Sequence, residues 1–212
     1  MFFIDIRTLF VNYVVINIIG LLLISIPYAQ IRKKFPKSVV IVISFAMSAS
    51  GNMLIFFQDV LPDWLSIVVG NTLVVSSTVV LLIGFEKFLN KKEKQIQNYI
   101  LLFIFFVVHS YFTVVHPNLH MRSINIIFFQ VLLSSQIAWL MLVKAPRELR
   151  KTTRNKGYIF CSVFVIECVR MVVIILRSKQ FQNYYNLDDS EVLFLLSYQI
   201  VLITLAYTIS LV

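Results

Sequence analysis

Charged side chains are scarce in this sequence. They make up 14% of its 212 residues, whereas soluble globular proteins carry about 25%. Hydrophobic residues reach 59%, and the mean hydropathy is +0.86. A chain with so few charges cannot cover itself with a solvated surface. The composition therefore excludes an ordinary soluble domain and indicates a membrane protein.

Glycine and histidine are also rare, and their scarcity excludes several chemistries. With 5 glycines in the whole chain, a glycine-rich loop that cradles phosphate groups is excluded. The GxxxxGK[ST], GxSxG and HExxH motifs do not occur. The 3 histidines, His109, His116 and His120, lie close together in the chain, whereas a haem or di-iron enzyme needs them on facing helices. We therefore expect no catalytic residue, no metal site and no cofactor in this segment.

Cysteine occurs twice, as Cys161 and Cys168. Seven residues of helix separate two positions by roughly 10 Å, which is too far for a disulfide bond. We expect both cysteines to pack as small apolar side chains.

Long apolar runs fill the rest of the chain. The predicted spans are residues 8–31, 38–58, 64–85, 97–117, 123–143, 157–177 and 191–212. Each is close to the roughly 20 residues that a helix needs to cross about 30 Å of hydrocarbon. The expected fold class is all-α: a polytopic membrane protein in which residues 1–212 form a single domain of seven transmembrane helices.

Lysine and arginine gather in alternate loops. The segments IRKKFPK, EKFLNKKEK and KAPRELRKTTRNK hold 14 of the 19 basic residues, and the opposite segments hold Arg7, Arg122, Arg177 and Lys179. The positive-inside rule therefore predicts an N-terminus outside and a C-terminus inside. This topology explains most of the net charge of +9. We expect no nucleic-acid partner, because no loop interleaves basic residues with the aromatic ones that stack on bases.

Two charged residues interrupt the sixth span. Glu167 and Arg170 each cost on the order of 3 kcal/mol near a bilayer centre. At positions i and i+3 they share one face of a helix and can neutralise one another. Six other polar residues lie at a similar depth, roughly 10 Å below the outer surface, and they are Asn52, Asn71, His109, Gln130, Tyr198 and Gln199. We predict that these eight side chains face the bundle interior and bind a small ligand. Hydrogen bonding that only holds helices together remains an alternative.

Several segments resemble a known kind of membrane region. IDIRTLFV, LPDWLSIVVGNTLVV with the following GFEKFL, YFTVVHPNLHMR and APRELRK are similar to seven-helix regions at the N-terminus of bacterial signalling proteins. Most such proteins are diguanylate cyclases with a C-terminal GGDEF domain, and some are sensor histidine kinases. The resemblance implies a sensory region of the bacterial inner membrane, a homodimer in its parent protein, that signals to a cytoplasmic GGDEF or kinase domain. This sequence has no GGDEF string and no phosphoacceptor region, so such activity would belong to a longer parent.

The sequence thus predicts a sensory membrane module that binds an extracytoplasmic or membrane-borne small ligand. The last span ends in LAYTISLV without a charged stop, and we expect the natural chain to continue beyond it. A small seven-helix transporter or channel is the main alternative, and a purely structural subunit is another. A rhodopsin-like pigment is excluded, because residues 192–212 contain no lysine for a retinal Schiff base.

Overall fold

The structure, a computed structural model, describes residues 6–31, 39–91, 95–176 and 189–210, and these form helices and no strand. The helices are α1 (Ile6–Ile31), α2 (Val39–Phe56), η2 (Trp64–Val69), α3 (Gly70–Phe88), α4 (Ile96–Ser110), η3 (Tyr111–Val115), α5 (Leu119–Leu142), α6 (Arg150–Leu176) and α7 (Asp189–Ser210). Within the described residues, six helices are long and apolar enough to cross a membrane, and α7 adds the shorter apolar helix Leu196–Ser210. The chain is an all-helical, multi-pass membrane protein.

Helix ends differ from the predicted spans where polar residues act locally. Asn118 begins α5 earlier than predicted, because its side chain accepts a hydrogen bond of 3.1 Å from the backbone N–H of Met121. Asn90, with φ of 54°, follows the end of α3 in the left-handed conformation that asparagine tolerates. The helix α6 begins at Arg150 rather than at residue 157, because a helix can extend beyond the hydrocarbon into the region where charges are solvated. Predicted positions 38, 177, 211 and 212 lie outside the described residues.

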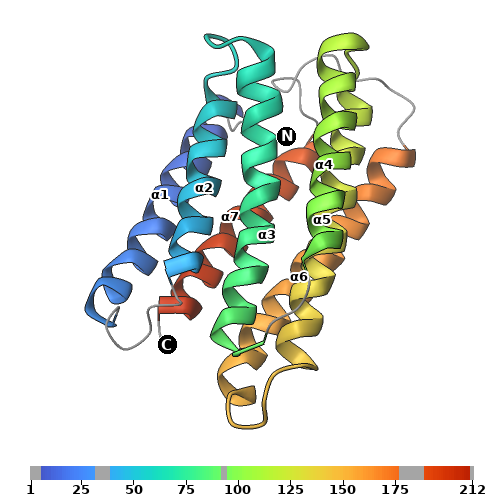
Figure 1. The fold of residues 1–212 in the computed structure, drawn as a ribbon. Coiled ribbons are helices and arrows are strands. Elements are labelled where there is room, and N and C mark those ends of the chain that lie inside the picture. Colours follow the sequence, from blue (N-terminus) through green and yellow to red (C-terminus); the bar gives the residue numbers. More distant parts are fainter. Residues whose placement is uncertain (1–5, 32–38, 92–94, 177–188, 211–212) are drawn as a thin grey trace.

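The contacts between helices join six of them into a closed ring that leaves out α4, and Figure 1 shows α4 at one side of the bundle. Around the ring, α1 contacts α2, α2 contacts α3, α3 contacts α5, α5 contacts α6, α6 contacts α7, and α7 contacts α1. The helix α4 packs on α3 and α5. We call the end where α3 and α5 finish and α4 and α6 begin the basic end, because Lys87, Lys144 and Arg147 lie there.

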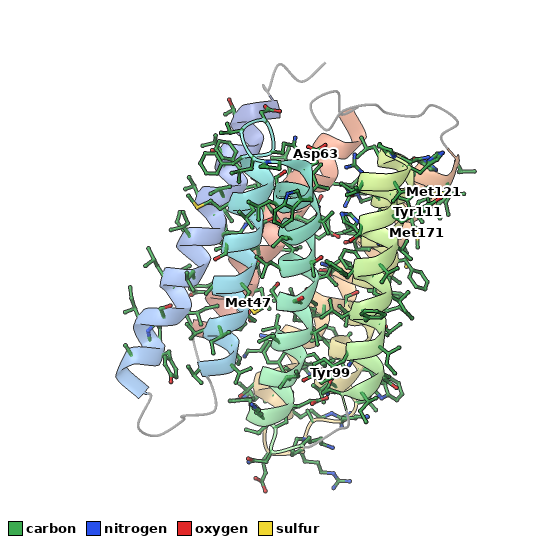
Figure 2. The ribbon with its side chains drawn as sticks, turned by 45° about the horizontal axis from the view of Figure 1, so that its top comes forward. Met47, Asp63, Tyr99, Tyr111, Met121 and Met171 are labelled. Carbon is green, nitrogen blue, oxygen red and sulfur yellow. The ribbon has the colours of Figure 1, made fainter. Side chains whose placement is uncertain are left out.

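Exposed aromatic side chains lie near both ends of the bundle. Tyr99, Trp139 and Tyr158 are exposed toward the basic end, and Trp64 and Tyr111 toward the opposite end. Figure 2 shows Tyr99 well separated from Tyr111 along the length of α4 and η3. Amphipathic rings favour the two water interfaces of a bilayer, so their positions agree with helices that cross one.

Apolar side chains fill the half of the ring nearer the basic end. This apolar core consists of Ile24, Ile41, Phe45, Leu81, Leu82, Phe85, Leu89, Ile137, Ala138, Leu140, Met141, Ala145, Phe160, Leu205 and Ala206. All six ring helices contribute to it, and Phe85 and Phe160 meet edge to face with ring centroids 6.0 Å apart. A smaller group, made of Val75, Val79, Phe105, Phe129 and Leu133, attaches α4 to α3 and α5. The ring is therefore closed by hydrocarbon on its basic side.

Candidate functional site

Amide and hydroxyl groups of α1 and α2 meet in the half of the ring away from the basic end. Asn17 on α1 is 2% exposed, and its Oδ1 accepts hydrogen bonds of 3.2 Å from both Ser48 Oγ and Asn52 Nδ2 on α2. Asn17 Nδ2 donates to the backbone carbonyl of Tyr13 at 2.8 Å. Lipid offers no partner to such groups, so they satisfy one another. We call Tyr13, Asn17, Ser48 and Asn52 the polar cluster.

Tyr13 connects the polar cluster to the charged residues of α6. Its phenol interacts with the side chains of Asn17 and Asn52 and lies within electrostatic range of Glu167 and Arg170. Glu167 is 1% exposed, and Arg170, one turn further along, is partly buried. The structure therefore brings three of the predicted site residues, Asn52, Glu167 and Arg170, into one region of the ring.

These groups have complementary chemistry. A carboxylate accepts hydrogen bonds, a guanidinium donates them, and a phenol or an amide does both. Electrostatic interactions are also stronger away from water, because the local dielectric constant is low. The arrangement can recognise a small polar group by charge and by directional hydrogen bonds. Gln199 lies on α7, which contacts both α1 and α6, and it is 6% exposed.

His109 belongs to a different group, outside the ring. Its ring is fully buried and stacks on Phe105, with centroids 5.1 Å apart and planes 18° apart. It lies beside the carbonyl of Ile67 on η2 and near Arg122 on α5. Neither ring nitrogen makes a hydrogen bond of ordinary geometry with a described residue. Asn125 Nδ2 joins α5 to α4 nearby, because it donates to the carbonyl of Phe105 at 3.2 Å.

Two π-helical turns border the His109 group. The segments η2 and η3 contact each other, and Thr113 on η3 donates from its hydroxyl to the carbonyl of His109 at 2.7 Å. π-Helical turns are uncommon and often occur at functional sites. In this bundle they accompany a buried aromatic and polar group that is separate from the polar cluster.

The other predicted site residues do not share a partner. Asn71 Nδ2 on α3 donates to the carbonyl of Ile67 on the adjoining η2 at 2.8 Å, and Gln130 Oε1 on α5 accepts from Thr78 Oγ1 on α3 at 3.4 Å. The hydroxyl of Tyr198 is buried and has no hydrogen-bond partner among the described residues. The eight predicted residues thus fall into the charged region of the ring, the His109 group and isolated positions.

No group of three or more histidine, cysteine or acidic residues that could hold a metal ion occurs in the part of the chain that the structure describes. His116 is exposed and His120 is partly exposed. Cys161 and Cys168 are both partly buried and form no disulfide.

Sequence reasoning missed Tyr13 and Asn17, the two residues that connect the polar cluster. Both lie in the first span, where an isolated amide among apolar residues resembles a packing position. The signal that could have found Asn17 is its depth, because it lies eleven residues, roughly 16 Å, from the first described residue of α1. An amide at such a depth cannot hydrogen-bond to water, so it needs a partner within the protein.

No protein-family model matches the chain, and no curated protein or solved structure matches it. What the chain does must therefore be inferred from the residues themselves.

Proposed function

We propose that this chain is a sensory membrane module that binds a small ligand within the ring and signals to a cytoplasmic output domain. The observation that supports it best is the contrast between the two halves of the ring. Tyr13, Asn17 and Asn52 lie with the Glu167 carboxylate on one side, whereas the apolar core closes the other. An ionisable residue buried within a membrane, such as Glu167, is by default a candidate for a functional site.

The ligand would meet groups of opposite charge. Arg170 attracts an anionic or carbonyl group, and Glu167 either orients Arg170 or binds a cationic group of the ligand. Asn52 and Gln199 supply directional hydrogen bonds, and the buried hydroxyl of Tyr198 supplies another. The proposal gives a different role to three other residues. The side chains of His109, Asn71 and Gln130 respond to changes in the packing of α3, α4 and α5.

A signal requires that the ligand favour one of two helix packings. The polar cluster is well placed for this, because α1 carries Tyr13 and Asn17 and packs along α7. The helix α7 also contacts α6, which carries Glu167 and Arg170. A ligand that draws α1 and α6 together would therefore shift α7, the last described helix before the C-terminus.

The remaining parts of the proposal follow from charge and resemblance. In this proposal the chain crosses a bacterial inner membrane seven times with its N-terminus outside, so the polar cluster belongs to the outer half of that membrane. The output domain is a diguanylate cyclase of the GGDEF kind or a histidine kinase, and the parent protein is a homodimer. The basic end then faces that domain.

A chimera tests this function. Residues 1–212 are joined to a GGDEF domain in a strain without other cyclases, and cyclic di-GMP is measured while cells receive a panel of short carboxylates, amines and zwitterions. Arg170→Leu is expected to abolish the response while the protein remains inserted. Val169→Leu is the matched control, because Val169 is 50% exposed on the same helix. A response that Arg170→Leu leaves unchanged would remove Arg170 from the site.

Uptake into proteoliposomes separates a sensor from the transporter or channel alternative. A transporter needs a route through both halves of the membrane. The apolar core blocks the basic half in this conformation. We expect binding without flux, and saturable uptake of a compound that also changes cyclase output would contradict a pure sensor.

A further inference from the structure

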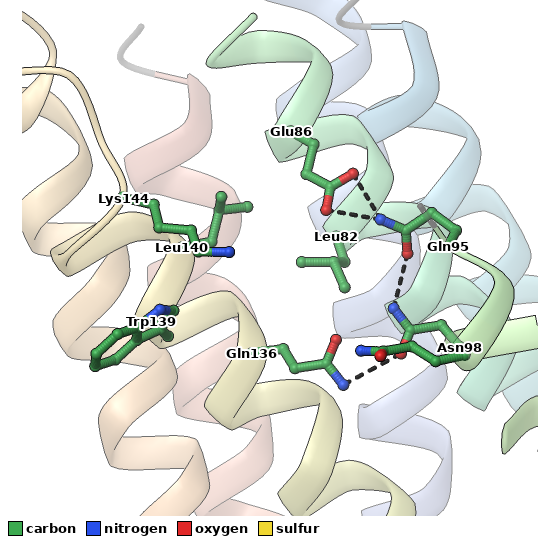
Figure 3. Close-up of a pocket in the computed structure, with 9 residues that line it drawn as sticks. Leu82, Glu86, Gln95, Asn98, Gln136, Trp139, Leu140 and Lys144 are labelled. Carbon is green, nitrogen blue, oxygen red and sulfur yellow. Dashed lines mark hydrogen bonds between the residues drawn. The ribbon is translucent and has the colours of Figure 1, made fainter. Parts of the chain in front are cut away.

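A polar pocket lies at the basic end, remote from the polar cluster (Figure 3). It has a volume of about 150 Å³ and is open on one side. Its lining comes from the end of α3, the start of α4 and the end of α5, and its polar residues include Glu86, Gln95, Asn98, Gln136, Trp139 and Lys144. Drug-sized ligands occupy pockets of about 300 Å³ or more, so this one suits only a small polar group.

A chain of amide hydrogen bonds forms one wall of the pocket (Figure 3). Gln136 Nε2 donates to Asn98 Oδ1 at 3.1 Å, and Asn98 Nδ2 donates to Gln95 Oε1 at 2.7 Å. Gln95 Nε2 then donates to both carboxylate oxygens of Glu86 at 2.7 Å. All donors point the same way, toward Glu86, and such chains polarise one another. Glu86 is 5% exposed, so the wall is a buried carboxylate held in one orientation.

The opposite wall carries positive charge. Trp139 on α5 and Lys144, two residues after the end of α5, lie across the pocket from Glu86 (Figure 3). A lysine ammonium offers three N–H donors, and the tryptophan indole offers one. The Glu86 carboxylate would repel a ligand that carries only negative charge, and the Lys144 ammonium would repel a ligand that carries only positive charge. A ligand with a cationic group at one end and an anionic group at the other fits both walls.

The depth of the pocket points to the lipid headgroup region. Glu86 lies two residues before the end of α3, Gln95 directly precedes α4, and Lys144 lies two residues after the end of α5. At about 1.5 Å per residue these positions are within roughly 5 Å of the helix ends. Trp139 is 57% exposed beside the opening, as expected for a residue at the membrane interface.

We propose that this pocket binds a phosphoethanolamine group, with its ammonium against Glu86 and its phosphate against Lys144 and Trp139. A carboxylate can accept several hydrogen bonds, so Glu86 can bind Gln95 and a primary ammonium together. A choline group has no N–H to donate, and among the described residues that line the pocket Trp139 alone is aromatic. The group can come from phosphatidylethanolamine or from a soluble phosphoethanolamine. This inference does not depend on the proposed sensory function.

Lipid exchange on the unaltered chain is the first test. Nanodiscs are made from phosphatidylcholine alone or with phosphatidylethanolamine, its N-methylated forms, or phosphatidylglycerol, and bound lipid is counted by native mass spectrometry. We expect phosphatidylethanolamine to be retained on the order of tenfold over phosphatidylcholine, the scale of one charge-assisted hydrogen bond. Retention should fall with each added methyl group. Equal retention of phosphatidylglycerol or phosphatidylcholine would show that the pocket does not select phosphatidylethanolamine.

A fluorescence titration tests the soluble source. The chain has 2 tryptophans, so Trp64→Phe leaves Trp139 as the only reporter, beside the pocket. Soluble O-phosphoethanolamine is added to this variant in phosphatidylcholine nanodiscs. A saturable change in Trp139 emission supports the soluble source. If neither this titration nor the lipid series shows a preference, the proposal is wrong.

Charge variants assign the binding to the two walls. Glu86→Gln and Lys144→Gln should each abolish the preference, and circular dichroism in phosphatidylcholine nanodiscs checks that each variant folds. The matched controls are Glu148→Gln and Lys151→Gln, which remove exposed charges at the same end and should keep it. A preference that persists in both pocket variants would overturn the site. If a variant does not fold, the headgroup series on the unaltered chain still decides.

Discussion

Gly51 on α2 and Gly70 at the start of α3 meet backbone to backbone. A Cβ atom on Gly51 would lie 2.7 Å from the carbonyl oxygen of Gly70, and a Cβ atom on Gly70 would lie 3.1 Å from that of Gly51. Small residues allow membrane helices to approach this closely. The next residue along each helix is Asn52 or Asn71, so this contact fixes the register of two predicted site residues.

Gly51→Ala should therefore destabilise the bundle. The new methyl group would collide with a backbone carbonyl, which cannot rotate away as a side chain can. We expect the free energy of unfolding to fall by about 1–3 kcal/mol, the usual cost of overpacking. The measurement is unfolding of the purified chain in mixed micelles with increasing dodecyl sulfate.

Gly20→Ala on α1 is the control for this comparison. The nearest atom to its Cβ would be Ala206 Cβ at 3.6 Å, an ordinary contact. Because alanine favours helix over glycine by roughly 0.5–1 kcal/mol, this variant should be at least as stable as the parent. Equal loss of stability in both variants would show that the Gly51 contact has no special role.

Much of the fold could be predicted from the sequence, because spanning helices are set by run length and by the sites of charge. The burial of Glu167 could also be predicted, since a carboxylate facing lipid is too costly. The sequence does not predict which helices contact one another. The helices are apolar on most sides, so hydrophobic periodicity does not identify their contact faces. The position of α4 outside the ring therefore has no signal in the chain order.

The pocket at the basic end was missed for a related reason. Glu86 precedes Lys87 and adjoins a basic loop, where a charge normally lies in water. Nothing in the local sequence shows that Gln95, nine residues later, turns back to bind it. Gln136 is one amide in the long apolar run of α5. Contacts between helices that depend on loop geometry are not encoded in spacing along one helix.

The Asn17 and Asn52 side chains should be energetically coupled. Asn17→Leu, Asn52→Leu and the double variant form a mutant cycle, measured by the same unfolding experiment. The hydrogen bond of 3.2 Å between them predicts a coupling energy of about 0.6 kcal/mol, with about 1.7 as an upper value for membrane helices. Ser50→Leu, on the exposed side of α2, is a control that should show no coupling with Asn17→Leu. Additive effects of the first pair would mean that this bond contributes nothing to stability.

Replacing His109 tests whether its polarity is used in the resting bundle. His109→Phe keeps a flat ring against Phe105 and removes two buried nitrogens that make no ordinary hydrogen bond to a described residue. We expect its thermal midpoint to equal or exceed that of the parent. His109→Ala should instead leave a cavity and lose about 3 kcal/mol, as other buried rings do on truncation to alanine. A clear loss in His109→Phe would reveal a hydrogen bond that the ring needs.

Replacing Gln95 should destabilise the protein far more than replacing its neighbour Gln97. Gln95→Leu removes both hydrogen bonds of 2.7 Å that it donates to the buried Glu86 carboxylate. Loss of a donor to a buried charged group costs about 1–3 kcal/mol. Gln97→Leu changes an exposed side chain, and its effect should stay within about 0.5 kcal/mol. Similar midpoints for the two variants in thermal unfolding would show that the amide chain does not stabilise Glu86.

Residues at the two ends of the bundle allow the topology to be measured. Single cysteines are introduced as Asp63→Cys and Arg147→Cys, both at exposed positions, in a chain with Cys161 and Cys168 changed to alanine. The positive-inside rule predicts that a membrane-impermeant thiol reagent labels position 63 in intact cells and position 147 only after lysis. The reverse pattern would invert the orientation and place the polar cluster toward the cytoplasm.

The number of crossings requires a separate measurement, because α7 has a shorter apolar stretch than the other helices. Green fluorescent protein is fluorescent in the cytoplasm, and alkaline phosphatase is active only outside it, so the two are fused in turn after residue 212. Seven crossings with an outer N-terminus predict fluorescence and no phosphatase activity. Six crossings would reverse both signals. An output domain after residue 212 would then lie outside the cell, where a cyclase or kinase has no nucleotide, and the sensory proposal would fail on topology alone.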